Sequence, residues 1–167
     1  MKKIISVFAL ALICGTISAQ MGKFQALYIF NFAKEIGWPK TDEQNDFVIT
    51  VIGDNGVASE LNKLAKTKKV GSRNVVIKEA SSINGISKSD IIVLGESRAS
   101  QIGQLVQLQH NNKSVIVSCK QGQCSSGACI AFEQSGSKLG FEISEQNFKK
   151  KNLSVHNKLL QLGKQVD

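Results

Sequence analysis

The sequence predicts one α/β domain with a mostly parallel sheet, helices on both faces and an antiparallel hairpin near its C-terminal end. Three observations support this prediction. Short apolar, β-branched runs alternate with segments of helical periodicity, as in βαβ units. Right-handed crossovers between parallel strands place helices on both faces of such a sheet. In the last third of the chain, two strand-like runs are separated by only a short turn, which favours a hairpin.

The first 19 residues have the three parts of a secretory signal peptide. Two lysines precede an apolar run, Ile4–Ile13, and small residues follow up to Ala19. The run is too short to span a bilayer as a helix. We expect cleavage after Ala19, which leaves a soluble domain over residues 20–167 in the periplasm. Secretion from the cell is the alternative.

The chain is basic, with a formal net charge of +8 that falls by 2 to +6 when the signal lysines leave. Its lysines are dispersed except for short groups such as Lys149–Lys151. Export argues against nucleic acid as a partner. The basic balance therefore favours attraction to an anionic membrane surface or to an acidic partner.

An amphipathic helix is expected directly after the signal peptide. One face of it carries apolar residues at helical spacing, namely Ala26, Ile29, Phe30, Ala33 and Ile36. Gly37 can end this helix, and Pro39 holds the preceding Trp38 in an extended conformation. We expect the apolar face to pack in the core.

Four strands of the parallel sheet are expected next, each a short run of mainly apolar or β-branched residues. They are Phe47–Ile52, Asn74–Lys78, Asp90–Leu94 and Ser114–Ser118. One helix is expected after the first strand, with Val57, Leu61, Leu64 and Ala65 on one face. A second helix is expected over Ser100–Gln109.

The last third predicts the hairpin and two further helices. The hairpin joins Cys129–Phe132 to Lys138–Ile143 through a turn that contains glycine and serine. Ser144 is a candidate N-cap of a short helix through Phe148. A final amphipathic helix is expected over Leu153–Val166.

Two strand ends carry the candidate contacts for a ligand or a partner, Gly53-Asp54 and Gly95-Glu96. Open α/β sheets often bind ligands beyond the carboxyl ends of their strands. The segment after Ile52 lacks the glycine spacing of a dinucleotide loop and the Lys-Ser/Thr pair of a phosphate loop. A tight strand-to-helix turn is therefore the alternative interpretation of this loop.

No motif for catalysis, a cofactor or a metal is found. His110 and His156 lie in polar contexts, and neither belongs to a paired-histidine motif. The Gly-x-Ser-x-Gly motif is absent. The sequence therefore predicts a protein that is not an enzyme, with no cofactor and no metal.

Three cysteines remain after Cys14 leaves with the signal peptide, and four residues separate each from the next. This spacing is a weak signal for zinc, so one disulfide and one free thiol are expected in an oxidising compartment. Gly127 can supply the turn that brings the Cβ atoms of Cys124 and Cys129 to roughly 4 Å. We expect a bridge between these two, with Cys119 as the alternative partner if its strand lies beside Cys129.

Several motifs together resemble the YfiR family of exported bacterial proteins. The segment Ala26–Pro39 is similar to the family's opening Tyr-x-x-Asn-Phe-Ala-Lys … Trp-Pro, and Phe47–Asp54 to its first strand, which ends in Gly-Asp. The segments Gly127–Phe132 and Lys138–Ile143 resemble its Gly-Gly-x-Ile-x-Phe … Phe-Glu-Ile-Asn region. Ala128 stands where the family has a second glycine, and the three cysteines do not reproduce its disulfide pattern.

The resemblance implies a non-enzymatic regulator that acts in the periplasm as a homodimer. Such a regulator binds and inhibits a membrane-bound diguanylate cyclase. An envelope release partner sequesters the regulator, which raises cyclic di-GMP and favours biofilm. The alternative function is a small-ligand-binding sensor module of the cell envelope, and an envelope hydrolase ranks below both.

Overall fold

The computed structural model describes residues 20–39, 45–136 and 138–166. The expected signal peptide, with Cys14, lies outside these residues. An N-terminal helix over residues 20–34 comes first. The elements that follow are β1 (Ile36–Gly37), β2 (Phe47–Ile52), α2 (Asn55–Ala65), β3 (Lys69–Val70), β4 (Arg73–Ala80), β5 (Ile91–Leu94), the 3₁₀ helix η2 (Glu96–Gln101), α3 (Ile102–Leu108), β6 (Val115–Ser118), the 3₁₀ helix η3 (Gln123–Ser126), β7 (Ile130–Ser135), β8 (Lys138–Ile143), α4 (Glu145–Lys150), β9 (Ser154–Val155), α5 (Asn157–Leu162) and β10 (Lys164–Gln165).

An eight-stranded sheet has the order β10-β8-β7-β6-β5-β2-β4-β3. Neighbours among β4, β2, β5, β6 and β7 are parallel, whereas β7 and β8 form the predicted antiparallel hairpin. If these five strands are numbered 1 to 5 in chain order, they lie side by side in the order 2-1-3-4-5, which is common among doubly wound sheets. The predicted mixed sheet and its hairpin are therefore confirmed.

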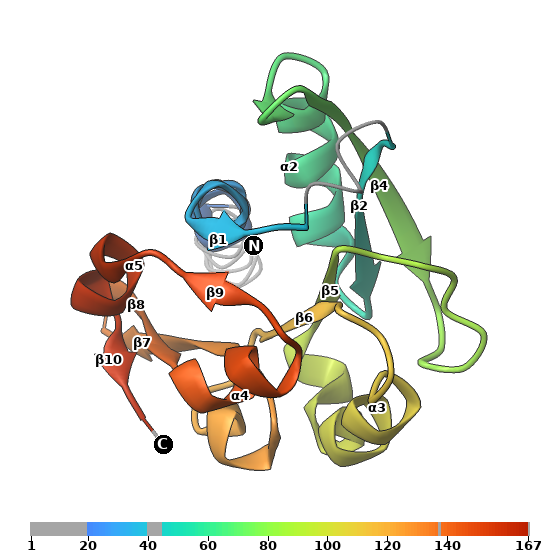
Figure 1. The fold of residues 1–167 in the computed structure, drawn as a ribbon. Coiled ribbons are helices and arrows are strands. Elements are labelled where there is room, and N and C mark those ends of the chain that lie inside the picture. The colour runs from blue at the N-terminus through green and yellow to red at the C-terminus, as the bar shows by residue number, and fades with distance from the viewer. Residues whose placement is uncertain (1–19, 40–44, 137, 167) are drawn as a thin grey trace, which may run out of the picture.

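Both faces of the central strands are buried, as expected for parallel strands covered by helices. On one face, Ile91 and Val93 of β5 pack in a core with the N-terminal helix and α2. On the other face, Ile92 and Leu94 pack in a second core with Leu105 of α3. The sheet curls around the N-terminal helix, which is seen end-on in Figure 1. The prediction of helices on both faces is confirmed.

The N-terminal helix buries the apolar face that its spacing predicts. Each member of that face is at most 4 % exposed, from Ala26 to Ile36. The helix ends before Gly37, because Ile36 and Gly37 form β1 and pair with β9. The indole Nε1 of Trp38 donates a hydrogen bond to the carbonyl oxygen of Ala33 at 2.7 Å and so holds the chain against the helix end.

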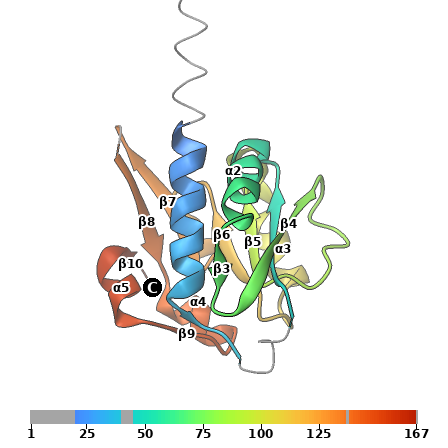
Figure 2. The ribbon, with the colours of Figure 1, turned by 90° about the horizontal axis from the view of Figure 1, so that it is seen from above.

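Four aromatic rings join this helix to the β7–β8 hairpin. Phe32 lies 4.8 Å from Phe141 and 5.8 Å from Phe132 between ring centroids. Tyr28 packs on the same rings, and its hydroxyl donates a hydrogen bond to the carbonyl oxygen of Leu139 at 3.3 Å. Figure 2 shows the helix lying between this hairpin and α2.

The predicted helix over Leu153–Val166 is wrong. Only α5 is helical there, and it is flanked by β9, which pairs with β1, and β10, which pairs with β8. The helix α5 ends at Gly163. A Cβ atom at this position would clash with the ring of Phe141, so glycine allows the close approach. Pairing with distant strands overrides the local periodicity in this segment. Leu162, one of the predicted apolar positions, is 68 % exposed.

Two other predicted helices differ only in detail. The segment Ser100–Gln109 is helical, but its first residues belong to η2 and α3 begins at Ile102. Ser144 caps α4 as predicted, because its Oγ accepts a hydrogen bond from the backbone N–H of Asn147 at 3.2 Å.

Candidate functional site

The two predicted loops meet where the strand order changes direction. The chain after β2 runs to β4 on one side, whereas β5 lies on the other side of β2. The backbone N–H of Gly95 donates to the carbonyl oxygen of Ile52 at 2.8 Å, and Ser97 Oγ donates to that of Gly53 at 2.9 Å. A crevice at such a point is where doubly wound sheets bind their ligands.

The two glycines allow the close approach of these loops. A Cβ atom at Gly95 would lie 2.5 Å from the carbonyl oxygen of Gly53. Gly53 itself has a φ of +70°, in the left-handed region that glycine adopts at little cost. Gly53 and Gly95 therefore shape the backbone, and the neighbouring Asp54 and Glu96 present side chains.

A cleft of about 540 Å³ opens at this crevice, and we call it the switch-point cleft. Its walls come from the start of the N-terminal helix, the loops after β2, β5 and β6, and the hairpin. The lining residues are Met21, Gly22, Gln25, Asp54, Gly56, Glu96, Cys119, Phe132, Gln134 and Leu139. The structure thus brings the predicted Asp54 and Glu96 into one site.

The switch-point cleft carries negative charge, and no lysine or arginine is found among its lining residues in the part of the chain that the structure describes. Asp54 Oδ1 accepts a hydrogen bond from the backbone N–H of Val57 at 2.9 Å and caps α2. The exposed Glu96 carboxylate has no hydrogen bond or ion pair among the described residues. Burial raises the pKa of the Cys119 thiol well above its usual range, and the carboxylates of Asp54 and Glu96 raise it further. Cys119 is therefore a neutral part of the wall.

Sequence reasoning did not find Gln25, Cys119, Phe132 or Leu139 as members of the site. Gln25 is only 9 % exposed, and its side-chain amide has no hydrogen bond to the described residues. It lies 29 residues before Asp54 in sequence and belongs to a predicted core helix. Gln25 is recognised as a cleft residue only from the position of that helix beside the loops after β2, β5 and β6.

The three described cysteines are free thiols in this structure, so the expected Cys124–Cys129 bridge is not formed in it. Cys124 Sγ lies 3.8 Å from the carbonyl oxygen of Cys129. The sheet register places Ile116 beside Cys129, because the backbone N–H of Cys129 donates a hydrogen bond to the carbonyl oxygen of Ile116 at 2.8 Å. Cys119 lies directly after β6, three residues beyond Ile116, and lines the switch-point cleft, so the register does not place it beside Cys129.

We expect the native thiols to react slowly with iodoacetamide at pH 8. Burial raises the pKa of Cys124 to about 12 and that of Cys129 to about 11. Because only the thiolate reacts, labelling should be at least about 100-fold slower than for an unperturbed cysteine. Mass spectrometry of timed samples measures the rate, and urea-unfolded protein is the control. Fast labelling of the native protein would contradict this prediction.

Slow labelling could also result from a disulfide, and peptide mapping without reductant distinguishes a slowly reacting thiol from a disulfide. A peptide that links Cys124 to Cys129 would establish the expected bridge in the exported protein. A peptide that links Cys119 to either of them would contradict both that expectation and the register.

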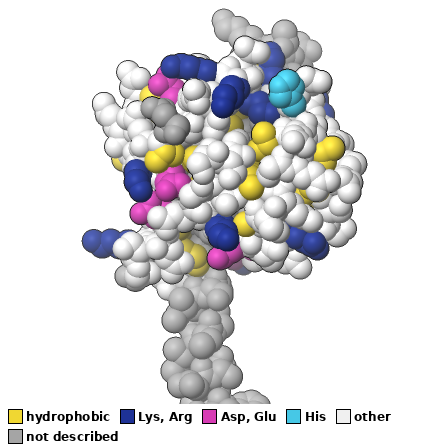
Figure 3. Space-filling model, turned by 90° about the horizontal axis from the view of Figure 1, so that it is seen from below, with side chains coloured by type: hydrophobic (Ala, Val, Ile, Leu, Met, Phe, Trp, Pro, Cys, Tyr) yellow, Lys and Arg dark blue, Asp and Glu magenta, His cyan; other side chains and the backbone are white. Residues whose placement is uncertain are grey.

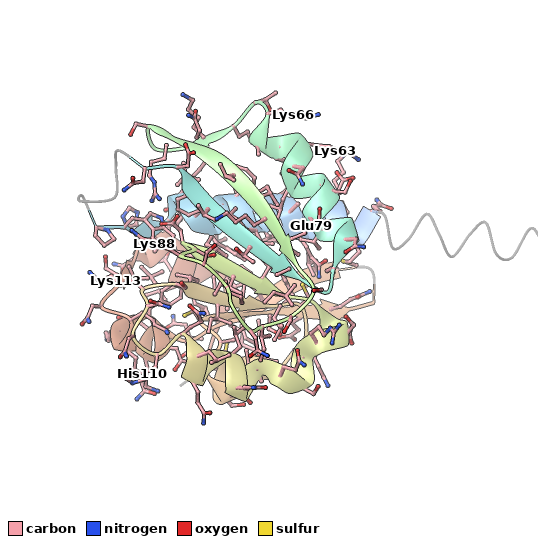
Figure 4. All side chains as sticks on the ribbon, turned by 90° about the vertical axis from the view of Figure 1, so that its right-hand side faces the viewer. Lys63, Lys66, Glu79, Lys88, His110 and Lys113 are labelled. Atoms are coloured by element: carbon pink, nitrogen blue, oxygen red, sulfur yellow. The ribbon has the colours of Figure 1, made fainter. Side chains whose placement is uncertain are left out.

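The opposite edge of the sheet, where the strands begin, is basic. Three hollows there share Lys113, and one of them is also lined by His110, Lys150 and Lys151. Figure 4 shows Lys88, Lys113 and His110 at this end, away from the start of the N-terminal helix. Figure 3 shows the adjoining face, over α3 and α4, with basic side chains around a histidine.

One lysine of the group Lys149–Lys151 is buried and has a structural role. Lys151 is 8 % exposed, and its Nζ donates a hydrogen bond to the carbonyl oxygen of Gln109 at 2.5 Å. Desolvation lowers the pKa of this amine, although Cys129 opposes the shift. Lys151 therefore joins the end of α4 to the end of α3, whereas Lys149 and Lys150 are exposed.

The described residues contain no group of three or more histidine, cysteine or acidic side chains that could hold a metal ion. His110 contacts Asn111, and His156 contacts Glu35, so neither histidine belongs to the cleft. Among the helices that the structure describes, none combines the length and the apolar character needed to cross a membrane.

Comparison with known families gives one match. Residues 22–164 match the protein family described as YfiR/HmsC-like. The match spans the N-terminal helix, the switch-point cleft and the hairpin. Comparison with curated proteins gives no match.

Proposed function

The chain belongs to the YfiR/HmsC-like family, a regulatory rather than a catalytic family, and from this we propose that it is an exported regulator of a membrane-bound signalling protein. In this proposal it binds a diguanylate cyclase in the periplasm and inhibits it. An envelope release partner sequesters the regulator, and cyclic di-GMP then rises and favours biofilm. The family match over residues 22–164 is the observation that carries the proposal.

The chemistry of the described residues supports binding rather than covalent catalysis. A catalytic nucleophile needs an activating base within hydrogen-bond reach. The thiol in the switch-point cleft is neutral, and neither described histidine lines that cleft. The site is a cleft with two carboxylates and an apolar wall, which are groups that can bind a ligand or a partner.

The charge distribution supports a partner at the membrane surface. The edge around Lys113 is basic, and it lies away from the acidic switch-point cleft. A basic surface attracts an acidic protein or an anionic lipid surface. We propose that this edge faces the membrane or an acidic part of the partner.

Export and self-association belong to the same proposal. Residues 1–19 act as the signal peptide, and the mature domain works in the periplasm as a homodimer. Light scattering at micromolar concentration tests the dimer. A monomer at that concentration would remove the dimer from the proposal without affecting the regulatory role.

Capture of the partner tests the proposed function. The mature chain, residues 20–167, serves as bait in a detergent extract of envelopes, and we expect it to recover a membrane signalling protein. Deletion of the gene should raise cyclic di-GMP, and the full chain should restore it. A form without residues 1–19 is the matched control, since it keeps the domain but is not exported. Recovery of no membrane signalling protein, or restoration by the control, would overturn the proposal.

A sensor module for a small ligand is the second candidate function, and the switch-point cleft is the observation that favours it. A ligand at 100 times its dissociation constant should add about 2.7 kcal/mol of stability. That gain corresponds to roughly 5–11 °C in the melting temperature of a domain of this size. A thermal-shift screen with a broad library measures it, and absence of any shift would count against a sensor role.

A further inference from the structure

We propose that the switch-point cleft binds a small organic cation, with an ammonium group between Asp54 and Glu96 and an apolar body against Phe132 and Leu139. This inference rests on the second function proposed above, a sensor of a small ligand. It adds the chemical class of that ligand. Four features of the cleft support it: charge, hydrogen-bonding capacity, the apolar wall and the unsuitability of the site for other ligands.

The charge of the cleft is opposite to that of the chain. The protein has a formal net charge of +8, yet none of the described residues that line this cleft is a lysine or an arginine. Asp54 uses one carboxylate oxygen to cap α2, and Glu96 has no partner among the described residues. Both carboxylates act on the same thiol, Cys119, so their fields converge on one region of the cleft. A cation placed there would gain from both charges.

The hydrogen-bonding groups match the three protons of an ammonium group. The second oxygen of Asp54 and the carboxylate of Glu96 supply two acceptors. Gln25 supplies a third, because this residue is 9 % exposed, lines the cleft and has no side-chain hydrogen bond to the described residues. An ammonium group donates three hydrogen bonds and accepts none. A bound donor would give the amide oxygen of Gln25 the partner that it lacks among the described residues.

The wall beyond these groups is apolar. Phe132 of β7 is 2 % exposed and lines the cleft, and Leu139 and Met21 line it as well. The volume of about 540 Å³ falls in the range typical of sites for small molecules. A ligand with an aromatic or branched aliphatic body next to its ammonium group would therefore use both parts of the cleft.

Other classes of ligand fit this site less well. Asp54 and Glu96 form no ion pair among the described residues, so their carboxylates repel the phosphate or carboxylate of an anionic ligand. A soft metal ion needs a thiolate, and the raised pKa of Cys119 keeps its thiol protonated. The described residues also lack the third acidic or histidine side chain of a typical metal site.

Three probes that share one ring test the inference. They are phenethylamine, 2-phenylethanol and phenylacetate, which differ mainly in the charge of the polar group. Binding to the mature chain is measured by NMR titration at up to about 10 mM. We expect phenethylamine to bind at least about tenfold tighter than 2-phenylethanol, with shifts at Gln25 and Glu96, and phenylacetate to bind more weakly than either.

Two variants that each remove one negative charge test whether the preference for the amine arises in the cleft. Glu96→Gln should weaken phenethylamine binding at least about tenfold, because it removes a charge that faces the ligand. Glu145→Gln is the matched control, since Glu145 pairs with Lys149 at the start of α4 and does not line the cleft. Its affinity should equal that of the unaltered protein, and both variants should keep the native melting temperature.

Four results would overturn the inference. Equal affinity for the amine and the alcohol, or an equal effect of the two variants, would show that charge in the cleft does not select the ligand. Tighter binding of phenylacetate would show an anion site and would leave the sensor function standing. No binding of any probe would exclude a cation site of useful affinity. Failure to capture a membrane protein affects only the regulatory proposal.

Discussion

Replacement of Arg73 by alanine is expected to lower the free energy of unfolding by about 3–5 kcal/mol, because it leaves a buried carboxylate without its partner. Arg73 and Asp90 form a buried ion pair, with side chains that are 7 % and 10 % exposed. The two guanidinium nitrogens donate to the two carboxylate oxygens at 3.0 and 2.8 Å. This paired geometry is among the strongest that charged side chains form.

The ion pair also joins the beginnings of three strands. Arg73 begins β4 and donates from Nε to the carbonyl oxygen of Asn45 at 2.8 Å. Asp90 precedes β5 and accepts a hydrogen bond from the backbone N–H of Val48 in β2 at 2.8 Å. The guanidinium carbon lies 4.9 Å from the ring centroid of Phe47. Loss of the arginine would therefore leave acceptors unpaired on several strands at once.

Urea denaturation of the Arg73→Ala variant measures the loss, and a fall in melting temperature of roughly 6–20 °C should accompany it. Lys63→Ala is the control, because its ion pair with Glu60 is exposed and is expected to contribute at most about 1 kcal/mol. The double variant Arg73→Ala, Asp90→Ala should lose less than the sum of the two single variants. Equal losses for Arg73→Ala and Lys63→Ala would contradict the expected role of burial.

The elements that the sequence predicts well are those with a strong local signal. The run Phe47–Ile52 is β-branched, bounded by polar residues and buried on both faces, and it is a strand as predicted. The longer segment Leu153–Val166 also has a clear local signal but is mostly not helical. Its two ends pair with β1 and β8, which are far away in sequence. Periodicity within the segment contains no information about those partners.

The same limit applies to the candidate site. Asp54 and Glu96 could be predicted because each follows a strand, and strand ends are recognisable. Their proximity depends on the place of β5 next to β2 rather than next to β4, which no local pattern specifies. The sequence predicts that Gln25 belongs to a core helix. It lines the cleft only because of where that helix lies in the fold. Sites built from several elements are therefore predicted only in part.

The second large effect is expected for Phe32→Ala, which should lower the free energy of unfolding by about 3–5 kcal/mol. Phe32 is 1 % exposed and lies among the rings of Tyr28, Phe132 and Phe141. Removal of the ring leaves a cavity where the N-terminal helix meets the hairpin. The residues around it belong to a sheet and a helix that are both fixed by other contacts, so they can fill the space only in part.

This substitution should also loosen the switch-point cleft, since the N-terminal helix and the hairpin form two of its walls. Hydrogen exchange should become faster at the amides of residues 20–34 than at those of β5 and β6, which are held by other contacts. Phe24→Ala is the matched control, because Phe24 is on the same helix, is 43 % exposed and should cost no more than about 0.5 kcal/mol. Equal stability losses for the two variants would show that the aromatic cluster does not anchor the helix. Faster exchange spread evenly over the domain would show that the helix and the sheet open together.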